Sequence, residues 1–183
     1  MNPLQLKFEY SAPNTKSLPE DVGSEVISIG YSNVGKSSFI NAIANERNLA
    51  KCSKTPGRTQ LFNIFSVNQD QRIIDLPGYG FAKAPKAQQA LWKQNLQTYL
   101  SQRLCLKGII LVTDIRRGLK PIDEDIVAWA KEHNMCFLII LNKADKLSKN
   151  ETQKAVSNLK QYYHIEEHEF EVCSCTKKTG IDT

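Results

Sequence analysis

A short glycine-bounded segment constrains the fold more than any other part of the chain. It reads Gly30-Tyr31-Ser32-Asn33-Val34-Gly35-Lys36-Ser37-Ser38 and fits the pattern G-x-x-x-x-G-K-[ST]. Without a Cβ at Gly30 and Gly35, the backbone can wrap closely around phosphates. A helix that begins near Lys36 turns the positive end of its dipole toward the same anion. The pattern therefore predicts a nucleoside triphosphate site in which Lys36 reaches the outer phosphates and Ser37 ligates Mg²⁺.

Hydrophobic segments on both sides of this loop predict its structural context. Residues 25–29 read as a buried strand, and Phe39, Ile40 and Ile43 fall on one helical face. Further strands are expected at 61–67, 72–75, 108–113, 135–141 and 170–173, most of them separated by helices. Strands that alternate with helices favour a mostly parallel sheet covered on both faces. We therefore expect a three-layer α/β/α fold with a six-stranded sheet and one antiparallel hairpin strand at its edge.

Length and composition favour one soluble domain. A chain of 183 residues with 41% hydrophobic and 23% charged residues suits a single core. Residues 1–23, which contain three prolines, are predicted to be an arm before a domain at 24–183. Residues 180–182 would be expected to open a last helix, so we expect the C-terminal helix to be missing. No signal peptide, lipid anchor or long apolar run is recognised, so a cytoplasmic location is expected.

Cysteine usage agrees with a reducing compartment. The five cysteines form no zinc-type arrangement of C-x-x-C pairs. Cys136 and Cys173 lie in apolar strand-like runs and are predicted to be reduced core residues.

Three further motifs follow predicted strands, which is where an open α/β sheet binds its ligand. Asp75-Leu76-Pro77-Gly78 fits D-x-x-G: Asp75 can reach the Mg²⁺ region through water, and the Gly78 N–H can meet a γ-phosphate. Asn142-Lys143-Ala144-Asp145 fits N-K-x-D, and Ser174-Cys175-Thr176 follows the last strand. Taken singly, D-x-x-G could be only a turn, and Ser174 could lie in a surface turn. N-K-x-D could be a chance match in which Asn142 only caps a strand. Their shared order favours one nucleotide site.

The N-K-x-D motif selects the base. The Asp145 carboxylate can accept N1–H and N2–H₂ of guanine, whereas adenine offers a lone pair at N1. A site that loses a polar partner in this way rejects the wrong ligand by up to ~10⁴-fold. Lys143 is expected along the base, Asn142 near N7, and the backbone N–H of Cys175 near guanine O6. GTP or GDP is therefore the predicted ligand.

The order of the motifs resembles the EngB family of bacterial GTPases, also called YihA or YsxC, in the Era-like group. The resemblance covers Phe8 to Asp182 and rests on G-x-S-N-V-G-K-S-S, T-P-G-R-T-Q, D-L-P-G-Y-G-F-A-K, D-x-R-R-x-L, N-K-A-D and S-x-x-K-K-x-G-I-D. It implies a P-loop GTPase fold, a role in assembly of the large ribosomal subunit, and a need for the protein in normal cell division and septation. The implied partner is the large subunit or its rRNA, with no DNA, no membrane and a monomeric state.

The same resemblance extends the site. Thr59, with Gly57 and Arg58 beside it, would join Ser37 on Mg²⁺ in the GTP state. Two positions depart from the family pattern: Tyr31 stands where a basic residue is usual, and Cys175-Thr176 replace a serine and an aliphatic residue.

Slow, Mg²⁺-dependent hydrolysis is expected from Lys36, Thr59, Gly78 and Asn33. Ras-type GTPases carry Gln directly after D-x-x-G, but this chain has Tyr79, which cannot orient water as Gln does. Two interpretations of Asn33 stay open. It either ligates K⁺, which would neutralise charge that develops on the phosphates, or only hydrogen-bonds its own loop.

Basic residues suggest where RNA would contact the protein. The loops at 48–60 and 76–86 are expected to order on the γ-phosphate and to be released after hydrolysis. They carry Lys51, Lys54, Arg58, Lys83 and Lys86, which either bind RNA or are ordinary solvated charges. A second cluster, Arg116, Arg117 and Lys120, either binds RNA or pairs with Asp123 and Glu124.

Two alternative functions are less well supported by the sequence. A P-loop phosphotransferase would need an arginine-bearing lid and a second substrate pocket, for which the motifs leave no room. A GTPase of a membrane or trafficking process would need a membrane segment or lipid site, and neither is recognised.

Overall fold

The computed structural model describes residues 3–50, 61–80 and 86–181. Its strands are β1 (Lys7–Ala12), β2 (Ser24–Ile29), β3 (Phe62–Ser66), β4 (Gln71–Asp75), β5 (Leu106–Asp114), β6 (Cys136–Asn142) and β7 (Phe170–Val172). Its α-helices are α1 (Lys36–Ile43), α2 (Lys86–Gln102), α3 (Pro121–Glu132) and α4 (Lys149–Tyr163). No described helix is both long enough and apolar enough to cross a membrane.

The described strands form one seven-stranded sheet in the order β1-β3-β4-β2-β5-β6-β7. Strands β4, β2, β5, β6 and β7 run parallel, whereas β3 is antiparallel to both of its neighbours. The predicted α/β architecture is confirmed, but the sheet has one strand more than the six expected. The additional strand is β1, which lies in the segment predicted to be an arm and pairs with β3 from Lys7↔Ser66 to Ala12↔Phe62.

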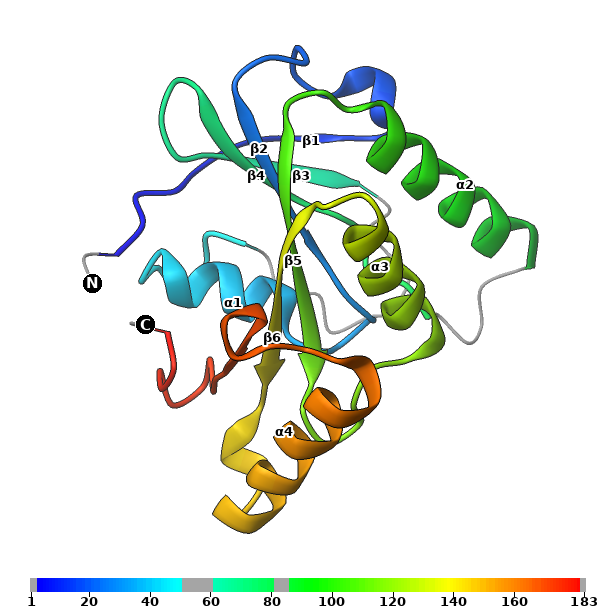
Figure 1. Cartoon of the computed structure of the whole chain (residues 1–183). Helices are drawn as coiled ribbons and strands as arrows, with labels where there is room; N and C mark the ends of the chain where they lie inside the picture. The colour runs from blue at the N-terminus through cyan, green and yellow to red at the C-terminus, as the bar shows by residue number, and fades with distance from the viewer. Residues whose placement is uncertain (1–2, 51–60, 81–85, 182–183) are drawn as a thin grey trace.

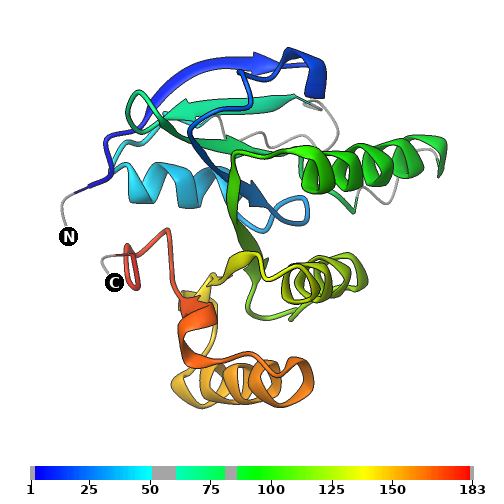
Figure 2. The same cartoon turned by 45° about the horizontal axis from the view of Figure 1, so that its top comes forward.

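Helices cover both faces of the sheet, as Figures 1 and 2 show. Ile27 and Ile29 of β2 belong to the same buried cluster as residues of α2, α3 and α4. Val112 of β5 and Ile140 of β6 pack instead with Phe39 of α1. Because successive side chains of a strand point to opposite faces, Leu111 of β5 belongs to the first cluster and its neighbour Val112 to the second, so β5 is apolar on both sides. The result is the expected three-layer arrangement, with α1 on one face.

Two helix starts follow their sequence signals. Pro121 is the first residue of α3, where its missing N–H costs nothing. At α4, Ser148 and Glu151 form a capping box: the Ser148 N–H donates to Glu151 Oε2 at 2.8 Å, and the Glu151 N–H donates to Ser148 Oγ at 3.3 Å.

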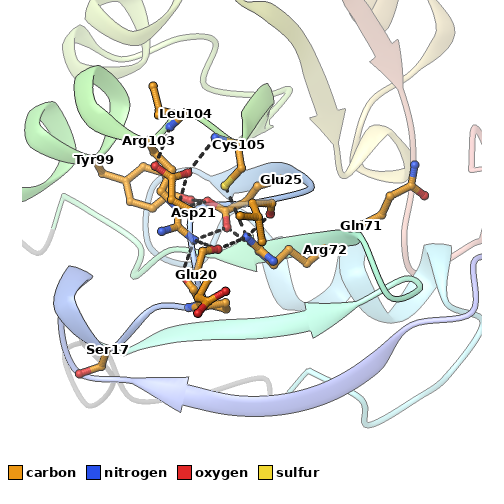
Figure 3. A network of polar contacts seen from close by, with 12 residues as sticks. Ser17, Glu20, Asp21, Glu25, Gln71, Arg72, Tyr99, Arg103, Leu104 and Cys105 are labelled. Carbon is orange, nitrogen blue, oxygen red and sulfur yellow. Dashed lines mark hydrogen bonds and ion pairs between the residues drawn. The ribbon is translucent and has the colours of Figure 1, made fainter.

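A buried ion-pair network lies at the amino end of β2, the end opposite the phosphate loop (Figure 3). Glu25 is fully buried and accepts from Arg72 Nε at 2.8 Å, from Arg103 Nε and Nη2 at 3.0 Å each, and from the Tyr99 hydroxyl. Burial opposes ionisation of Glu25, but the hydrogen bonds from Arg103 and Arg72 outweigh it and lower its pKa.

The same two arginines hold the chain that leads into β2. Their Nη2 groups donate to the backbone carbonyls of Pro19, Glu20 and Val22 at 2.7 to 2.8 Å. The network therefore joins the N-terminal segment to β4 and to the end of α2.

Candidate nucleotide site

The phosphate loop joins β2 to α1. Gly35 precedes the helix with φ of 105°, in the left-handed region, and a Cβ there would collide with Asn142 Nδ2. Gly35, the residue before α1, has no side chain that could cap the helix. The first-turn N–H groups of a helix with this kind of start are suited to an anion such as a phosphate.

Oxygen atoms suited to Mg²⁺ lie beside this loop. The Lys36 Nζ is 3.7 Å from Asp75 Oδ1, and both side chains are largely buried. Within the described part of the chain, Asp75 Oδ1 and Ser28 Oγ have no hydrogen-bond partner. Burial raises the pKa of Asp75, and the Lys36 charge opposes that rise. A buried carboxylate oxygen that makes no hydrogen bond, and has only Lys36 as an ion-pair partner among the described residues, fits a hard cation that keeps phosphate and water ligands.

The D-x-x-G loop lies directly against the phosphate loop. The Ser32 N–H donates to the Tyr79 carbonyl at 2.8 Å, and the Tyr79 N–H donates to the Gly30 carbonyl at 3.3 Å. A Cβ on Gly78 would lie 3.2 Å from Ser32 Cα, which is closer than most Cβ contacts in proteins, so the neighbouring backbone would have to shift slightly. The fold thus brings Gly78 next to the predicted phosphate site.

The side chain after D-x-x-G is directed into the protein. Tyr79 is 3% exposed, and its hydroxyl donates to Asp123 Oδ1 at the start of α3. Its ring packs against Tyr31 and Trp92, with centroid distances of 4.7 and 4.9 Å. Burial and the nearby Asp123 charge raise the pKa of Tyr79, so the phenol stays neutral. The Tyr79 hydroxyl is therefore occupied by its hydrogen bond to Asp123 of α3.

The N-K-x-D loop is joined to the phosphate loop by direct hydrogen bonds. Asn142 Nδ2 donates to the Val34 carbonyl at 2.9 Å, and Lys143 Nζ donates to the Asn33 carbonyl at 2.6 Å. Asn142 Oδ1 accepts from the Lys143 N–H at 2.8 Å and from the Cys175 N–H at 3.2 Å. Residues from three separate motifs therefore meet at Asn142.

Asp145 is held as an ionised acceptor. Its Oδ1 accepts from Ser174 Oγ at 2.7 Å, and its Oδ2 lies 3.2 Å from Lys146 Nζ. The Ser174 hydrogen bond lowers the pKa of Asp145, with a smaller contribution from Lys146. The Ala144 N–H donates to the Cys173 carbonyl at 3.1 Å, so the two loops are also joined through their backbones. The arrangement can accept two N–H groups from a base.

Asp114, the first residue of the D-x-R-R-x-L motif, is a buried residue of the site to which the sequence analysis assigned no role. Its carboxylate accepts from Arg116 Nε and Nη2 at 2.9 and 2.6 Å and lies 3.1 Å from Lys143 Nζ. Burial opposes its ionisation, but these cations lower its pKa. The sequence feature that could have identified Asp114 is an acidic residue at the end of an apolar strand. The ion pair between Asp114 and Lys143 orients the lysine side chain.

Several predicted residues lie outside the described ones: Gly57, Arg58, Thr59, Lys51, Lys54 and Lys83. Arg116 pairs with Asp114, whereas Asp123 and Glu124 accept hydrogen bonds from Tyr79 and Tyr163. Arg116 and Arg117 are exposed. Of the two alternatives for this cluster, pairing with Asp123 and Glu124 does not hold for Arg116, whereas the Lys120 backbone N–H donates to Asp123 Oδ2 at 2.8 Å.

Comparisons with known proteins identify the family. A family model described as "50S ribosome-binding GTPase" matches residues 25–143. A protein of Klebsiella pneumoniae named "Probable GTP-binding protein EngB" is 43% identical over 177 residues, covering 96% of this chain and 84% of the relative. A protein of the same name from Coxiella burnetii is 42% identical over 180 residues, covering 97% of this chain and 88% of the relative.

Solved structures agree with this match. A crystal structure of "a probable GTP-binding protein engB" is similar with a TM-score of 0.71 and 24% identity, over 87% of this chain and 93% of that one. Era in complex with MgGDPNP and part of 16S ribosomal RNA is similar in fold, with a TM-score of 0.64 and 20% identity, over 88% of this chain and 54% of that one. Its sequence relatives and its match to the GTPase family model show that the chain belongs to the EngB family of GTP-binding proteins and is a GTPase.

Proposed function

We propose that this GTPase is a cytoplasmic molecular switch in assembly of the large ribosomal subunit, required for normal cell division and septation. The observation that carries the switch is the direct contact between the phosphate loop and both other motif loops, through Ser32–Tyr79 and Asn33–Lys143. The ribosomal partner is supported by the description of the matched family model. It is also supported by Era, a protein of similar fold solved with a segment of ribosomal RNA.

In this proposal GTP or GDP spans the joined loops. The phosphates lie against Gly30–Ser38, with Lys36 on the outer phosphates and Gly78 donating its N–H to the γ-phosphate. Ser37 and Thr59 would hold Mg²⁺, with Asp75 acting through water. The ion, when bound, offsets charge on the outer phosphate oxygens.

The base lies in the loop pair around Asn142. Asp145 accepts from the guanine N1–H and N2–H₂, and the Ser174 hydroxyl keeps the carboxylate in position. Lys143, held by Asp114, lies along the base. The Cys175 N–H, which donates to Asn142 Oδ1 in the structure, turns to guanine O6.

Hydrolysis is slow because Tyr79 points to α3 and not to an attacking water. Asn33 is exposed on the phosphate loop with φ of 65°. We propose that it helps to bind K⁺ beside the phosphates, an electrostatic contribution to the transition state. GTP turnover in K⁺ should exceed turnover in Na⁺ at equal ionic strength, and equal rates would remove the K⁺ assignment.

Sedimentation with separated ribosomal subunits tests the partner. The protein should pellet with large subunits in the presence of a non-hydrolysable GTP analogue, and not with GDP or with small subunits. Pelleting should weaken as salt rises, because contact with RNA phosphates releases counterions. The same result in GTP analogue and GDP would contradict the switch, and absence of pelleting in both would contradict the ribosomal role.

A further inference from the structure

Two cysteines flank Ser174 in the loop proposed for the base. Cys173 directly follows β7 and is fully buried, whereas Cys175 is half-buried. Cys173 Sγ lies 3.8 Å from Asn142 Oδ1, and the Cys175 N–H donates to the same oxygen at 3.2 Å. Both cysteines therefore surround the side chain that links the base loops to the phosphate loop.

The two cysteines pack in the same cluster of buried side chains and differ in their exposure. Their contact lowers the pKa of the Cys175 thiol and raises that of Cys173, and burial raises both. The thiolate is the reactive form of cysteine toward oxidants. Cys175, more exposed and more easily ionised, is therefore the thiol that we expect to be oxidised first, with Cys173, two residues away in the same cluster, as the resolving thiol.

A bond between the sulfurs would change the base loop. A disulfide keeps its Cβ atoms ~3.8 Å apart and its central torsion near ~90°. Ser174 forms an isolated antiparallel bridge with Thr179, and residues two apart on extended backbone are about 6.6 Å apart, so the backbone of Ser174 has to rotate to meet these limits. That backbone now donates to the Thr179 carbonyl at 2.9 Å, and the Ser174 hydroxyl orients Asp145. Rotation would disturb both Asp145 and the Cys175 N–H.

We propose that Cys173 and Cys175 are a redox-sensitive thiol pair whose oxidation releases guanine nucleotide. The inference rests on the proposed base site. Hydrogen peroxide is the oxidant: the Cys175 thiolate attacks one oxygen, the O–O bond breaks, and a sulfenic acid and hydroxide form. The Cys173 thiol then gives up its proton and its sulfur attacks the Cys175 sulfur, so that the S–S bond forms, the S–O bond breaks and the hydroxyl group leaves with that proton as water. With one proton taken up by the hydroxide, two thiols and one peroxide give a disulfide and two waters.

Binding of a fluorescent GDP analogue to the full chain, before and after peroxide, tests the proposal. The variant Cys175→Ser keeps the backbone N–H but cannot form the disulfide. Cys136→Ser is the matched control: Cys136 was expected in the core, but it is exposed at the amino end of β6, the end away from Asn142. Mass spectrometry of the peptide with both cysteines gives an independent readout.

Peroxide should weaken nucleotide binding at least about tenfold in wild type and Cys136→Ser, with recovery in dithiothreitol and no loss in Cys175→Ser. The peptide should lose about 2 Da, the mass of two hydrogens, and bound GDP should slow that loss. Unchanged affinity after complete disulfide formation would overturn the proposal, as would an equal loss in Cys175→Ser. Untreated protein that fails to bind the analogue would instead overturn the base site itself, before any oxidant is added.

Discussion

Replacing Glu25 by Gln should destabilise the protein strongly although the residue is remote from the nucleotide. The carboxylate accepts from Arg72, Arg103 and Tyr99, and the carboxamide would turn an NH₂ donor toward these donors. Breaking a buried ion pair from one side costs about 3–5 kcal/mol. In the variant, both arginine side chains would keep their slight exposure, 11% and 12%, and their backbone hydrogen-bond acceptors. We therefore expect the free energy of unfolding to fall by about 3 kcal/mol, near the lower limit of that range.

Urea unfolding of nucleotide-free protein, followed by tryptophan fluorescence, measures this loss, since bound nucleotide would add its own stabilisation. For a chain of this length, about 3 kcal/mol also corresponds to a melting temperature lower by about 6–12 °C. The folded pKa of Glu25 is lowered from 4.5. The contribution of ionised Glu25 to the free energy of unfolding is therefore complete above pH 4.5, and it is lost as the pH falls through the lower pKa of Glu25 in the folded protein. The difference between wild type and variant should narrow in that acidic range.

A matched control is Glu9→Gln, which alters an exposed glutamate 3.2 Å from Lys7 on β1. Its unfolding midpoint should stay at the wild-type value, because solvent screens such pairs and the Gln carbonyl can still accept the hydrogen bond that Ser66 Oγ donates to Glu9 Oε1 at 2.6 Å. If Glu25→Gln unfolds at the same urea concentration as wild type, the network in Figure 3 does not stabilise the fold as argued.

Three further substitutions test the site. Asp145→Asn should lower GTP affinity by about 10²–10⁴-fold and favour xanthosine triphosphate, measured by competition binding; retained GTP affinity would contradict the guanine assignment. Tyr79→Phe leaves Asp123 without one donor and should lower the free energy of unfolding by about 1–3 kcal/mol, with GDP affinity unchanged; lost GDP binding would mean that the hydroxyl serves the nucleotide. Gly35→Ala adds about 1–2 kcal/mol of left-handed strain and a collision with Asn142, so nucleotide binding should be lost while circular dichroism keeps its folded spectrum; normal binding would refute the tight approach of these loops.

The parts of the fold that the sequence could predict are those whose side chains carry the signal. Strands β5 and β6 contain nearly continuous apolar runs, and β2 carries Val26, Ile27 and Ile29 directly before the glycine-rich loop. Parallel strands place the loops that follow them at one edge of the sheet. The meeting of the phosphate, D-x-x-G and N-K-x-D loops was therefore predictable. Strand β1 was not, because most of its side chains are exposed and main-chain bonds to β3 determine its place.

Contacts between elements far apart in the chain also could not be predicted from the sequence. The Tyr79–Asp123 hydrogen bond joins residues 44 positions apart and depends on where α3 packs. The pairing of Asp114 with Lys143 depends on the register of β5 with β6, which places Asp114 opposite Asn142. The fully buried Glu25 reads as a polar interruption in an apolar strand, and only its two arginine partners explain it.

The bonds from Asn142 to Val34 and from Lys143 to Asn33 have a kinetic consequence for nucleotide exchange. They join the supports of the base and of the phosphates into a single unit, so neither end of a bound nucleotide can be loosened alone. We expect GDP to leave in one exponential step and not through a state held only by its phosphates. A partner that speeds nucleotide exchange could then act at either the N-K-x-D loop or the phosphate loop. Displacing the N-K-x-D loop would also displace the loop that binds the phosphates.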